Sequence, residues 1–435
     1  MSMRLELASF PVRDTRFAAS TSYERGVLSI DREELHSLLL ESGDFEDVLI
    51  DVVRPGQAVR LIHVMDAVEP RWKAAHGTAF PGFLSLASTA AGEGRTNRLA
   101  GMAIIAAGNS VAGETTYWRE AIIDMSGPLA DVTPFGSTIN LVLEFRPAAE
   151  YLDANHQDAA IANMMTGSPL SQRYNQAVRL AELKAAEYLA HSSAGLDPDE
   201  LEVFELGPAS PELPRVVYFF QMSGLLVYGR DVERALPTLM HPNELLDGAL
   251  VNIRSNSFAA SRYSTYECQT HALVRALQAR HGRDLNFAGT IIYPATAEVV
   301  AVKEVVSSYA VKVARMLGAQ GACSSYMGGG HPCVEFMLIC QKAERAGIKI
   351  VSVMPEGYGT PDDPGFVHFV PEATRIVSTG RTTQQVDFPK VERVLGGESF
   401  FNMPGVPGEQ LKLPYYYVFG ACVSTGSGQL AAKQY

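Results

Sequence analysis

The sequence lacks the marks of a membrane protein or of a nucleic-acid-binding protein. Charged residues make up only 19% of its 435 residues, and 48 acidic side chains outnumber 36 basic ones, which gives a formal net charge of −12. Binding to nucleic acid or to anionic lipid needs clustered Lys and Arg, so neither is favoured as the main function. The longest apolar stretch, near residues 99–111, is broken by Gly, Asn and Ser and falls short of the roughly 18–20 residues of a membrane span.

Cysteine is also scarce, because the chain has only five. This number is too small for a disulfide scaffold and, being odd, leaves at least one free thiol, so we expect a reducing, cytoplasmic location. The first residues alternate between charged and apolar types, which does not match the apolar core of a secretory signal. At about 100–200 residues per domain, the length predicts a soluble protein of two or three domains.

Short apolar segments dominate the first third of the chain. Residues 48–53, 58–64 and 138–145 are partly alternating and rich in β-branched side chains, and residues 102–107 form a continuous apolar run. Both patterns are typical of strands, the second of a buried one. We therefore predict a β-rich domain over residues 1–150.

The pattern then becomes helical and, after residue 210, alternates. Residues 171–191 have an apolar face at helical spacing, and residues 195–214 are rich in Pro, Asp and Glu, so we predict a helical connector over 151–210. The rest, 211–435, is predicted as an α/β domain with a doubly wound, mostly parallel sheet, which binds ligands at the carboxyl ends of its strands. Its expected strands are 216–222, 286–293, 318–324 and 348–354, and its expected helices are 298–317 and 331–346.

One candidate site is the loop Ser-Ser-Tyr-Met-Gly-Gly-Gly-His-Pro-Cys at residues 324–333. It follows an expected strand and opens an expected helix, so backbone N–H groups near Gly329, Gly330 and His331 can hold a carboxylate or phosphate. The alternative is an ordinary strand-to-helix turn that uses glycine for steric reasons.

A second candidate is a metal site. Cys268 and His271, with His331 and Cys333, pair thiols and imidazoles at close spacing, and together they would make a Cys2His2 set suited to zinc. The alternative is that the two cysteines pack as small apolar side chains.

Two further segments carry polar groups with more than one interpretation. Residues 252–261, Asn-Ile-Arg-Ser-Asn-Ser-Phe-Ala-Ala-Ser, suit a strained turn that presents a hydroxyl to the preceding carbonyl, as self-cleavage requires, or a plain hydrogen-bonded loop. In the β-rich domain, Arg71 of Glu-Pro-Arg is a candidate carboxylate clamp and Asp124 a candidate acid, base or amine ligand. The alternative for both is an ion pair that fixes loop shape.

In their order along the chain, these segments resemble the proprotein subunit of component B of glycine, sarcosine and betaine reductases, and more distantly the D-proline reductase proprotein. The most specific segment is Ile-Ile-Asp-Met-Ser-Gly-Pro-Leu-Ala-Asp-Val-Thr-Pro-Phe at 122–135. Supporting segments lie at 69–71, 80–82, 228–231, 236–238, 247–249, 280–282 and 432–435.

The resemblance implies an oxidoreductase that reductively cleaves a C–N bond of a small amino acid or amine. In that family the proprotein cuts itself at an internal cysteine, and the new N-terminus becomes a pyruvoyl group that binds the substrate amine as an imine. A second, thiol- or selenol-bearing subunit of the component then attacks the substrate carbon, so the resemblance also implies an oligomer. Covalent attachment to a carbonyl makes an amine a workable leaving group.

The sequence departs from the family at the processing position, where Ser255 or Ser257 stands in place of cysteine. Serine can form a pyruvoyl group by the same route, although a thiol ionises far more readily than a hydroxyl. Two hypotheses follow. Either the chain is self-processed at Ser255 or Ser257 and works as a reductase subunit, or it stays uncut and binds an amino-acid-like ligand or uses the Cys/His metal site.

Overall fold

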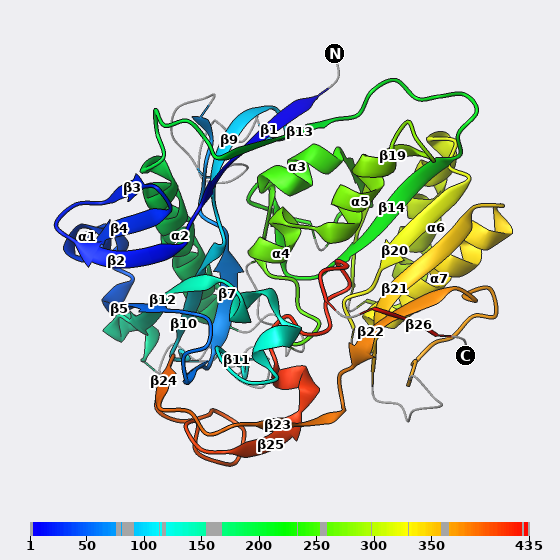
Figure 1. Cartoon of the computed structure of the whole chain (residues 1–435). Coiled ribbons are helices and arrows are strands. Elements are labelled where there is room, and N and C mark those ends of the chain that lie inside the picture. The colour runs from blue at the N-terminus through cyan, green and yellow to red at the C-terminus, as the bar shows by residue number, and fades with distance from the viewer. Residues whose placement is uncertain are drawn as a thin grey trace.

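A computed structural model places a β-rich half beside a parallel sheet, with three short helices between them (Figure 1). The fold class predicted from the sequence, α/β with a doubly wound sheet, is confirmed. Among the residues that the structure describes, no helix is long and apolar enough to cross a membrane. The structure describes residues 3–74, 80, 91–112, 114, 119–153, 168–232, 234–252, 259–296, 298–328, 330–357, 365–428 and 430–433.

The β-rich half contains two four-stranded sheets, ordered β13-β1-β9-β8 and β5-β12-β10-β7, and a small sheet β2-β4-β3. Every residue of β10 is buried, as its continuous apolar sequence predicts. The elements are β1 (Arg4–Pro11), β2 (Asp14–Ala18), β3 (Ser22–Glu24), β4 (Val27–Asp31), α1 (Arg32–Leu40), β5 (Phe45–Val53), β7 (Val64–Val68), β8 (Arg71–Trp72), β9 (Gly94–Ala100), β10 (Met102–Gly108), β12 (Ile139–Pro147), α2 (Pro169–His191) and β13 (Glu200–Glu205).

The segment expected as a connector contributes two elements to this half. The apolar face of α2, with Tyr174, Val178 and Leu189 fully buried, joins the same core as β10 and β12. Strand β13 pairs antiparallel with β1, although its region was expected to be a linker because of its Pro, Asp and Glu content. The alternation of Glu with Leu, Val and Phe in β13 suits an edge strand. The domain boundaries themselves stay predictions.

The second half is built on a seven-stranded sheet, ordered β17-β19-β14-β20-β21-β22-β26. Its five central strands are parallel, and the outer strands β17 and β26 are antiparallel to their neighbours. If the five parallel strands are numbered by their order in the chain, they lie side by side in the order 2-1-3-4-5. The direction of this order therefore reverses between β14 and β20. The strands are β14 (Arg215–Met222), β17 (Thr238–Met240), β19 (Asn286–Pro294), β20 (Gly321–Ser325), β21 (Lys349–Glu356), β22 (Ile376–Arg381) and β26 (Ala431–Lys433).

Helices cover both faces of this sheet, as the alternation within β14 requires. Val217 and Phe219 pack with α6 (Val300–Met316) and α7 (Pro332–Arg345). Tyr218 and Phe220 point the other way, toward the helices α3 (Pro242–Asp247), α4 (Thr265–Gln269) and α5 (Ala272–Arg280).

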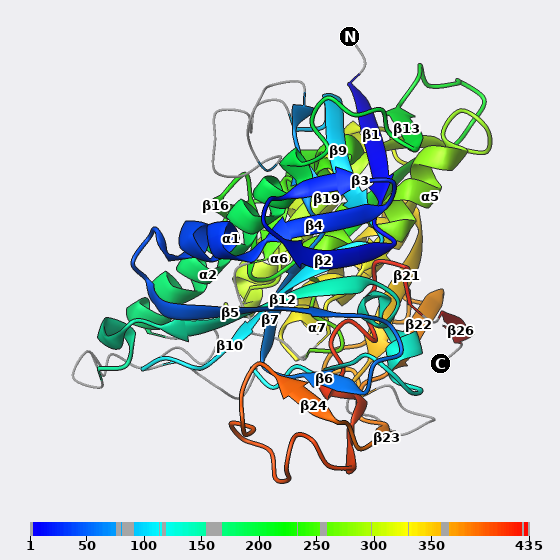
Figure 2. The same ribbon diagram turned by 60° about the vertical axis from the view of Figure 1, so that its left-hand side comes forward.

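After β22 the chain returns to the β-rich half. Strand β24 pairs parallel with β6, which also pairs with β11, and Figure 2 shows β24 beside β6. A further bridge joins Ile122 to Val418. The β-rich half is therefore completed by chain that follows β22. The remaining strands are β6 (Val59–Leu61), β11 (Ile123–Asp124), β15 (Leu225–Val227), β16 (Arg230–Asp231), β18 (Leu250–Asn252), β23 (Gln385–Phe388), β24 (Arg393–Leu395) and β25 (Leu411–Pro414).

Candidate functional site

A pocket lies at the carboxyl ends of β20, β21 and β22. Tyr326 follows β20, Glu356 ends β21 and Thr382 follows β22, and all three line the pocket. Its space, open mouth included, is about 390 Å³. Doubly wound sheets bind ligands at this edge, close to the point where the strand order reverses, so the pocket is the leading candidate for a binding site.

The glycine loop after β20 shapes this pocket. Gly328 has φ of +91°, and a Cβ built on it would lie 2.8 Å from Ser261 Oγ, so only glycine fits between the loop and Ser261. Gly330 also lines the pocket but has room, since its nearest neighbour is a Val367 atom at 4.0 Å. Gly329 lies outside the described residues. His331 is exposed at the start of α7, and its carbonyl accepts a hydrogen bond from Lys303 at 3.3 Å.

The charge in the pocket comes from Glu356, whose carboxylate is held from two sides. Its Oε1 accepts a hydrogen bond from Ser378 Oγ at 2.6 Å, and its Oε2 lies 2.9 Å from Arg381 Nη2. These contacts fix the carboxylate rather than leave it to rotate. The pocket therefore combines a glycine-rich backbone on one side with an oriented carboxylate on the other.

Both ends of the predicted processing segment are anchored by hydrogen bonds, and the downstream end lies next to this pocket. Ser255 and Ser257 themselves lie outside the described residues. Before them, the Asn252 N–H donates to Thr265 Oγ1 at 3.0 Å. After them, Ala260 donates to the Tyr416 carbonyl at 3.0 Å, and Ser261 lines the pocket.

A group of buried carboxyls lies against the anchored residues. Asp66 accepts hydrogen bonds from the backbone N–H and the hydroxyl of Thr265, and it lies 3.3 Å from Arg179. Glu182 lies 2.9 Å from the same guanidinium. Burial raises the pKa of both carboxyls, and the Asp66 charge adds to the rise at Glu182.

Glu267 belongs to the same region. Its Oε2 accepts hydrogen bonds from the backbone N–H and the hydroxyl of Ser264 at 2.9 and 2.8 Å, while its Oε1 has no hydrogen-bond partner in the described structure. Burial raises the pKa of Glu267 to about 8 and lowers the pKa of the neighbouring Arg262 to about 9. Such carboxyls can exchange protons near neutral pH.

This group of carboxyls was not predicted from the sequence. A signal for it was present, because Asp66 interrupts the apolar run of β7, and Glu182 falls on the apolar face of α2 between Val178 and Ala185. The hydrophobic pattern assigns these positions to the core. Acidic side chains at such positions are usually paired with an opposite charge or have a function.

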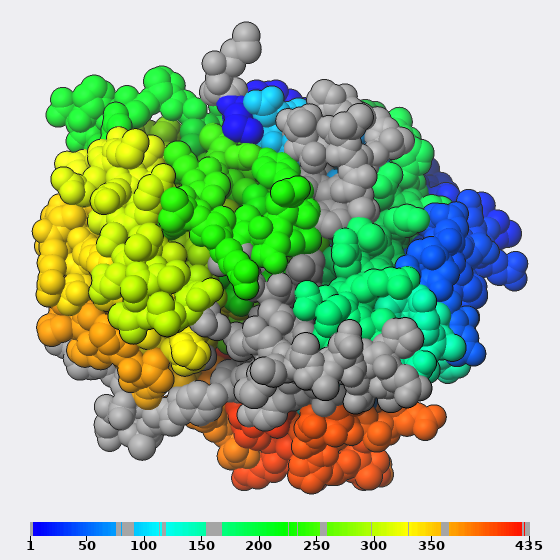
Figure 3. Space-filling model, turned by 180° about the vertical axis from the view of Figure 1, so that it is seen from behind, coloured from blue at the N-terminus to red at the C-terminus, as the bar shows by residue number. Residues whose placement is uncertain are grey.

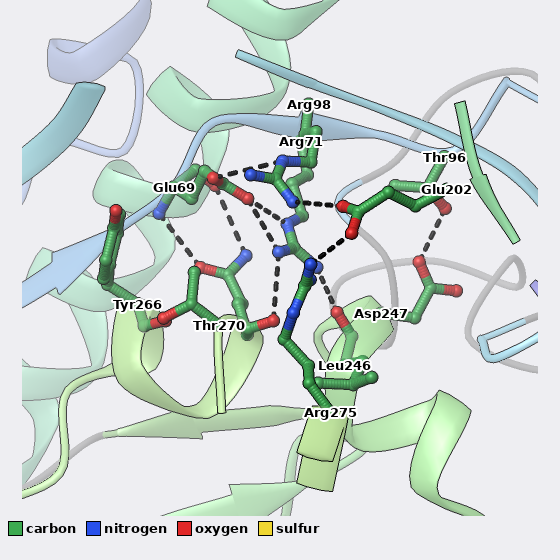
Figure 4. A network of polar contacts seen from close by, with 11 residues as sticks. Glu69, Arg71, Thr96, Arg98, Glu202, Leu246, Asp247, Tyr266, Thr270 and Arg275 are labelled. Atoms are coloured by element: carbon green, nitrogen blue, oxygen red, sulfur yellow. Dashed lines mark hydrogen bonds and ion pairs between the residues drawn. The ribbon is translucent and has the colours of Figure 1, made fainter. Parts of the chain in front are cut away.

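Arg71, the predicted carboxylate clamp, lies in a buried network of internal partners (Figure 4). Its guanidinium pairs with Glu69 at 2.7 Å, and it donates to the backbone carbonyls of Leu246 and Gln269. Burial lowers the pKa of Arg71, with Glu69 opposing this shift. Leu246 and Gln269 bracket the predicted processing segment, so Arg71 ties both of its flanks to β8.

The network continues through further pairs, some buried and some half-buried. Glu69 also lies 3.4 Å from Arg98, which lies 3.3 Å from Glu202. Asp247 accepts a hydrogen bond from Thr96 Oγ1 at 2.6 Å and pairs with Lys73. Every charge here has an opposite charge beside it, which is the condition for burying ions without a large penalty.

Asp124 has a separate set of partners. Its two carboxylate oxygens lie 2.6 and 2.8 Å from Arg60, which also donates to the carbonyls of Pro389 and Pro407 at 2.7 Å. Burial raises the pKa of Asp124, opposed by Arg60. Arg71 and Asp124 therefore lie in two internal networks outside the pocket. The geometry favours the ion-pair alternative for both, and a ligand role for either stays a prediction.

The predicted metal ligands are divided between two faces of the sheet, with Cys268 and His271 on one face and Cys333 on the other, and His331 is exposed. Cys268 packs in the core with α3 to α5, and His271 Nε2 lies 3.0 Å from the Tyr218 hydroxyl. Cys333 packs in the other core and donates to the His368 carbonyl at 3.3 Å. Burial lowers the pKa of His271 to about 3 and raises those of both thiols. Across the described residues, no three His, Cys, Asp or Glu side chains form a group suited to a metal ion.

Comparison with known proteins places the chain among reductase components. Residues 3–409 match the family model for glycine/sarcosine/betaine reductase component B subunits. The chain is 32% identical to the glycine reductase complex component B subunits alpha and beta of Acetoanaerobium sticklandii, over 100% of each chain. Two proteins of Peptoclostridium acidaminophilum are also similar. The sarcosine reductase complex component B subunit alpha is 33% identical over 91% of this chain and 89% of its own, and the betaine reductase counterpart is 32% identical over 93% and 90%. No solved structure gives a significant match.

Proposed function

Since the chain belongs to the family of glycine, sarcosine and betaine reductase component B subunits, we propose that it reductively cleaves a C–N bond of a small amino acid or amine. The observation that carries this proposal is the similarity over the whole chain to a component of the glycine reductase complex. The first substrates to test are glycine, sarcosine and betaine, which appear in the names of the relatives. The names of these relatives refer to complexes. This supports the proposal that the chain acts together with a second subunit that bears a thiol or selenol.

Self-processing at Ser255 or Ser257 is the second part of the proposal. One relative that matches over its full length is named as two subunits, alpha and beta, which supports division of one chain into two. The serine hydroxyl adds to the preceding carbonyl carbon, and the peptide C–N bond breaks to leave an ester. Elimination releases the upstream carboxylate and leaves a dehydroalanine, and water then replaces its nitrogen, which departs as ammonia.

The surroundings of the segment suit this chemistry. Its flanks are anchored, since Asn252 donates to Thr265 and Ala260 donates to the Tyr416 carbonyl. Elimination needs a proton acceptor, and Glu267, with a pKa of about 8 and a buried oxygen without a partner in the described residues, is a group of that type nearby in sequence. A pyruvoyl group would supply a carbonyl that activates the substrate amine. The pocket would hold the substrate between the backbone of the glycine loop and the ion pair of Glu356 with Arg381.

Substitution of the two serines tests the processing step. Ser255→Ala and Ser257→Ala are expected to differ, with one chain remaining uncut on a denaturing gel while the other is divided. Cysteine at the same position is expected to restore cleavage and to speed it, because a thiolate forms more readily. If the wild-type chain stays whole, the alternative of an uncut ligand-binding homologue is favoured. A chain that is cut in both alanine variants would remove both serines as precursors.

Isolation of the chain from its native host tests the partner. We expect a separately encoded subunit with a reactive thiol or selenol to co-purify, because the described cysteines of this chain are buried or half-buried. Burial raises the pKa of Cys268, Cys323, Cys333, Cys340 and Cys422, which makes them poor nucleophiles. Reductase activity by the isolated chain, without any partner, would contradict this part of the proposal.

A further inference from the structure

Arg119 is fully buried in the β-rich half, although its guanidinium carries a full positive charge. Its Nη2 donates to the Gly108 carbonyl at 3.0 Å, and its Nε lies 2.9 Å from Glu114 Oε1. Its Nη1 has no hydrogen-bond partner among the described residues. Buried donors in folded proteins nearly always have a partner, so a charged donor without one indicates a bound water, ion or ligand.

Arg262 brings a second buried guanidinium to the same place. It donates to the carbonyl of Val64 at 2.7 Å, and Val64 pairs with Ala107 across strands β7 and β10. The next residue of β10 is Gly108, to which Arg119 donates. The two arginines are therefore anchored to neighbouring carbonyls on paired strands. The electrostatics agree with this placement, because burial lowers the pKa of Arg262 and the charge of Arg119 lowers it further.

Acidic side chains lie beside these arginines, but two of them are mostly protonated at neutral pH. Burial raises the pKa of both Glu182 and Glu267 to about 8. Arg179, which pairs with Glu182, adds a third guanidinium whose charge also lowers the pKa of Arg262. We call Arg119, Arg179 and Arg262 the arginine cluster. Among the described residues around it, the guanidiniums therefore outnumber the carboxylates that stay ionised at pH 7.

The arginine cluster lies inside the molecule, near the downstream end of the predicted processing segment. Ala259 packs with Val64 and Phe419, and the Arg262 guanidinium lies 5.0 Å from the centre of the Phe419 ring. Helix α2, which carries Arg179, packs against β7 and β10 and covers this side of the β-rich half, where Figure 3 shows it in colours between cyan and green. This enclosed position favours a ligand of only a few atoms.

We propose that Arg119 and Arg262 form a buried site for a small carboxylate, separate from the pocket at the edge of the seven-stranded sheet, which neither of them lines. A guanidinium presents its N–H groups as a planar fork that matches the two oxygens of a carboxylate. One negative charge also offsets the excess of positive charge in the arginine cluster. The choice of ligand rests on the proposed function, because glycine, sarcosine and betaine differ at nitrogen but share a carboxylate, which C–N cleavage does not remove.

Thermal unfolding of the full-length chain with added sodium acetate tests the site, with sodium chloride at the same ionic strength as the reference. We expect acetate to raise Tm of the wild type until the site is saturated, and Arg119→Met to lower the affinity by about tenfold or more. Arg119→Lys should lose less, because an ammonium keeps the charge without the fork, and it serves as the test variant if Arg119→Met does not fold. Arg71→Met, which changes a buried arginine of another network, should respond to acetate as the wild type does.

The pH dependence separates a ligand site from a purely structural arginine. The affinity for acetate should fall as pH rises from about 7 to 9, because Glu182 and Glu267 then lose their protons and supply the negative charge themselves. Loss of the Arg262 proton, with a pKa of about 9, acts in the same direction. Glu267→Gln should reduce this fall, whereas an arginine that only stabilises the fold would give no such dependence of acetate binding.

Glycine identifies the source of the carboxylate. Competition of glycine with acetate would mark the substrate as the ligand, and glycine binding that Arg119→Met leaves unchanged, beside lost acetate binding, would mark a carboxylate without an amine. The proposal is overturned if acetate has no effect on the wild type, if Arg119→Met leaves the response unchanged, or if Arg381→Met of the pocket abolishes it. A stronger response to inorganic phosphate through Arg119 would also overturn it. This assay needs neither a partner nor turnover, so a chain that binds acetate here but reduces no substrate would contradict the proposed function alone.

Discussion

Replacing Arg71 by methionine separates a structural role from a ligand-binding role. The substitution keeps much of the side-chain volume but removes the guanidinium that pairs with Glu69 and donates to the carbonyls of Leu246 and Gln269. Removing one partner of a buried ion pair costs about 3–5 kcal/mol, because the other charge is left without compensation. Here Arg98, 3.4 Å from Glu69, retains part of that compensation, so we expect the lower end of the range.

Thermal unfolding measures this cost. A chain of 435 residues has an unfolding entropy of about 0.9 kcal/mol/K, so about 3 kcal/mol lowers Tm by about 3 °C if the chain unfolds as one unit. Arg71→Lys is expected to fall between the wild type and Arg71→Met, since an ammonium cannot reproduce the fork of hydrogen bonds. Glu69→Gln combined with Arg71→Met is expected to recover part of the loss, because no buried charge remains unpaired at this pair.

Binding measurements show whether Arg71 also contacts the ligand. If Arg71 is structural, folded Arg71→Met retains the affinity of the wild type for glycine, sarcosine or betaine in calorimetry. A variant with unchanged Tm and lost affinity would show that Arg71 contacts the ligand. That result would refute our reasoning from the network in Figure 4.

Three further results are expected. Gly328→Ala should lower both Tm and the affinity for substrate, because its φ of +91° and the 2.8 Å approach to Ser261 leave no room for a methyl group, while Gly330→Ala, with 4.0 Å of clearance, should change neither. The free energy of unfolding should fall as pH rises from about 4.5 to 8, by up to about 1.4 kcal/mol per pH unit from Glu267. The reason is that folded Glu267, with a pKa of about 8, holds a proton that the unfolded chain has lost; Glu267→Gln should flatten this part of the profile, and an unchanged slope would contradict it. The two fragments of a processed chain should elute together until denaturant is added, because β14 of the first lies between β19 and β20 of the second; separate elution in buffer would count against this fold.

The sequence predicted most of the secondary structure of the second half. Hydrophobic strands that alternate with amphipathic helices give a strong signal, and β14, β19, β20, β21, α6 and α7 lie within a few residues of their expected positions. The order of the strands was not predicted, because periodicity shows which residues are buried and not which strands pair. For the same reason the return of β24 to β6 was missed, since these strands are far apart in the chain.

The candidate site was less accessible from sequence. The glycine loop was expected at the carboxyl edge of the sheet, and Gly330 does line the pocket there. Arg71 and Asp124 were candidates for ligand binding, with an ion pair as the alternative. Glu69 and Arg60 lie beside them, and a sequence gives no sign of which opposite charge will be nearest. The pairing of Asp66 with Thr265 joins residues 199 apart, so it follows only from the folded chain.

The mass of the chain purified from its native host under denaturing conditions tests the central claim most directly. We predict two fragments, residues 1–254 and 255–435 for processing at Ser255, or 1–256 and 257–435 for Ser257, in place of one 47.1 kDa species. Their summed mass should exceed that of the intact chain by one water less one ammonia, and the second fragment should lack a free amine and react with a carbonyl reagent. A single 47.1 kDa species, or fragments that together gain a whole water as in simple proteolysis, would contradict the claim.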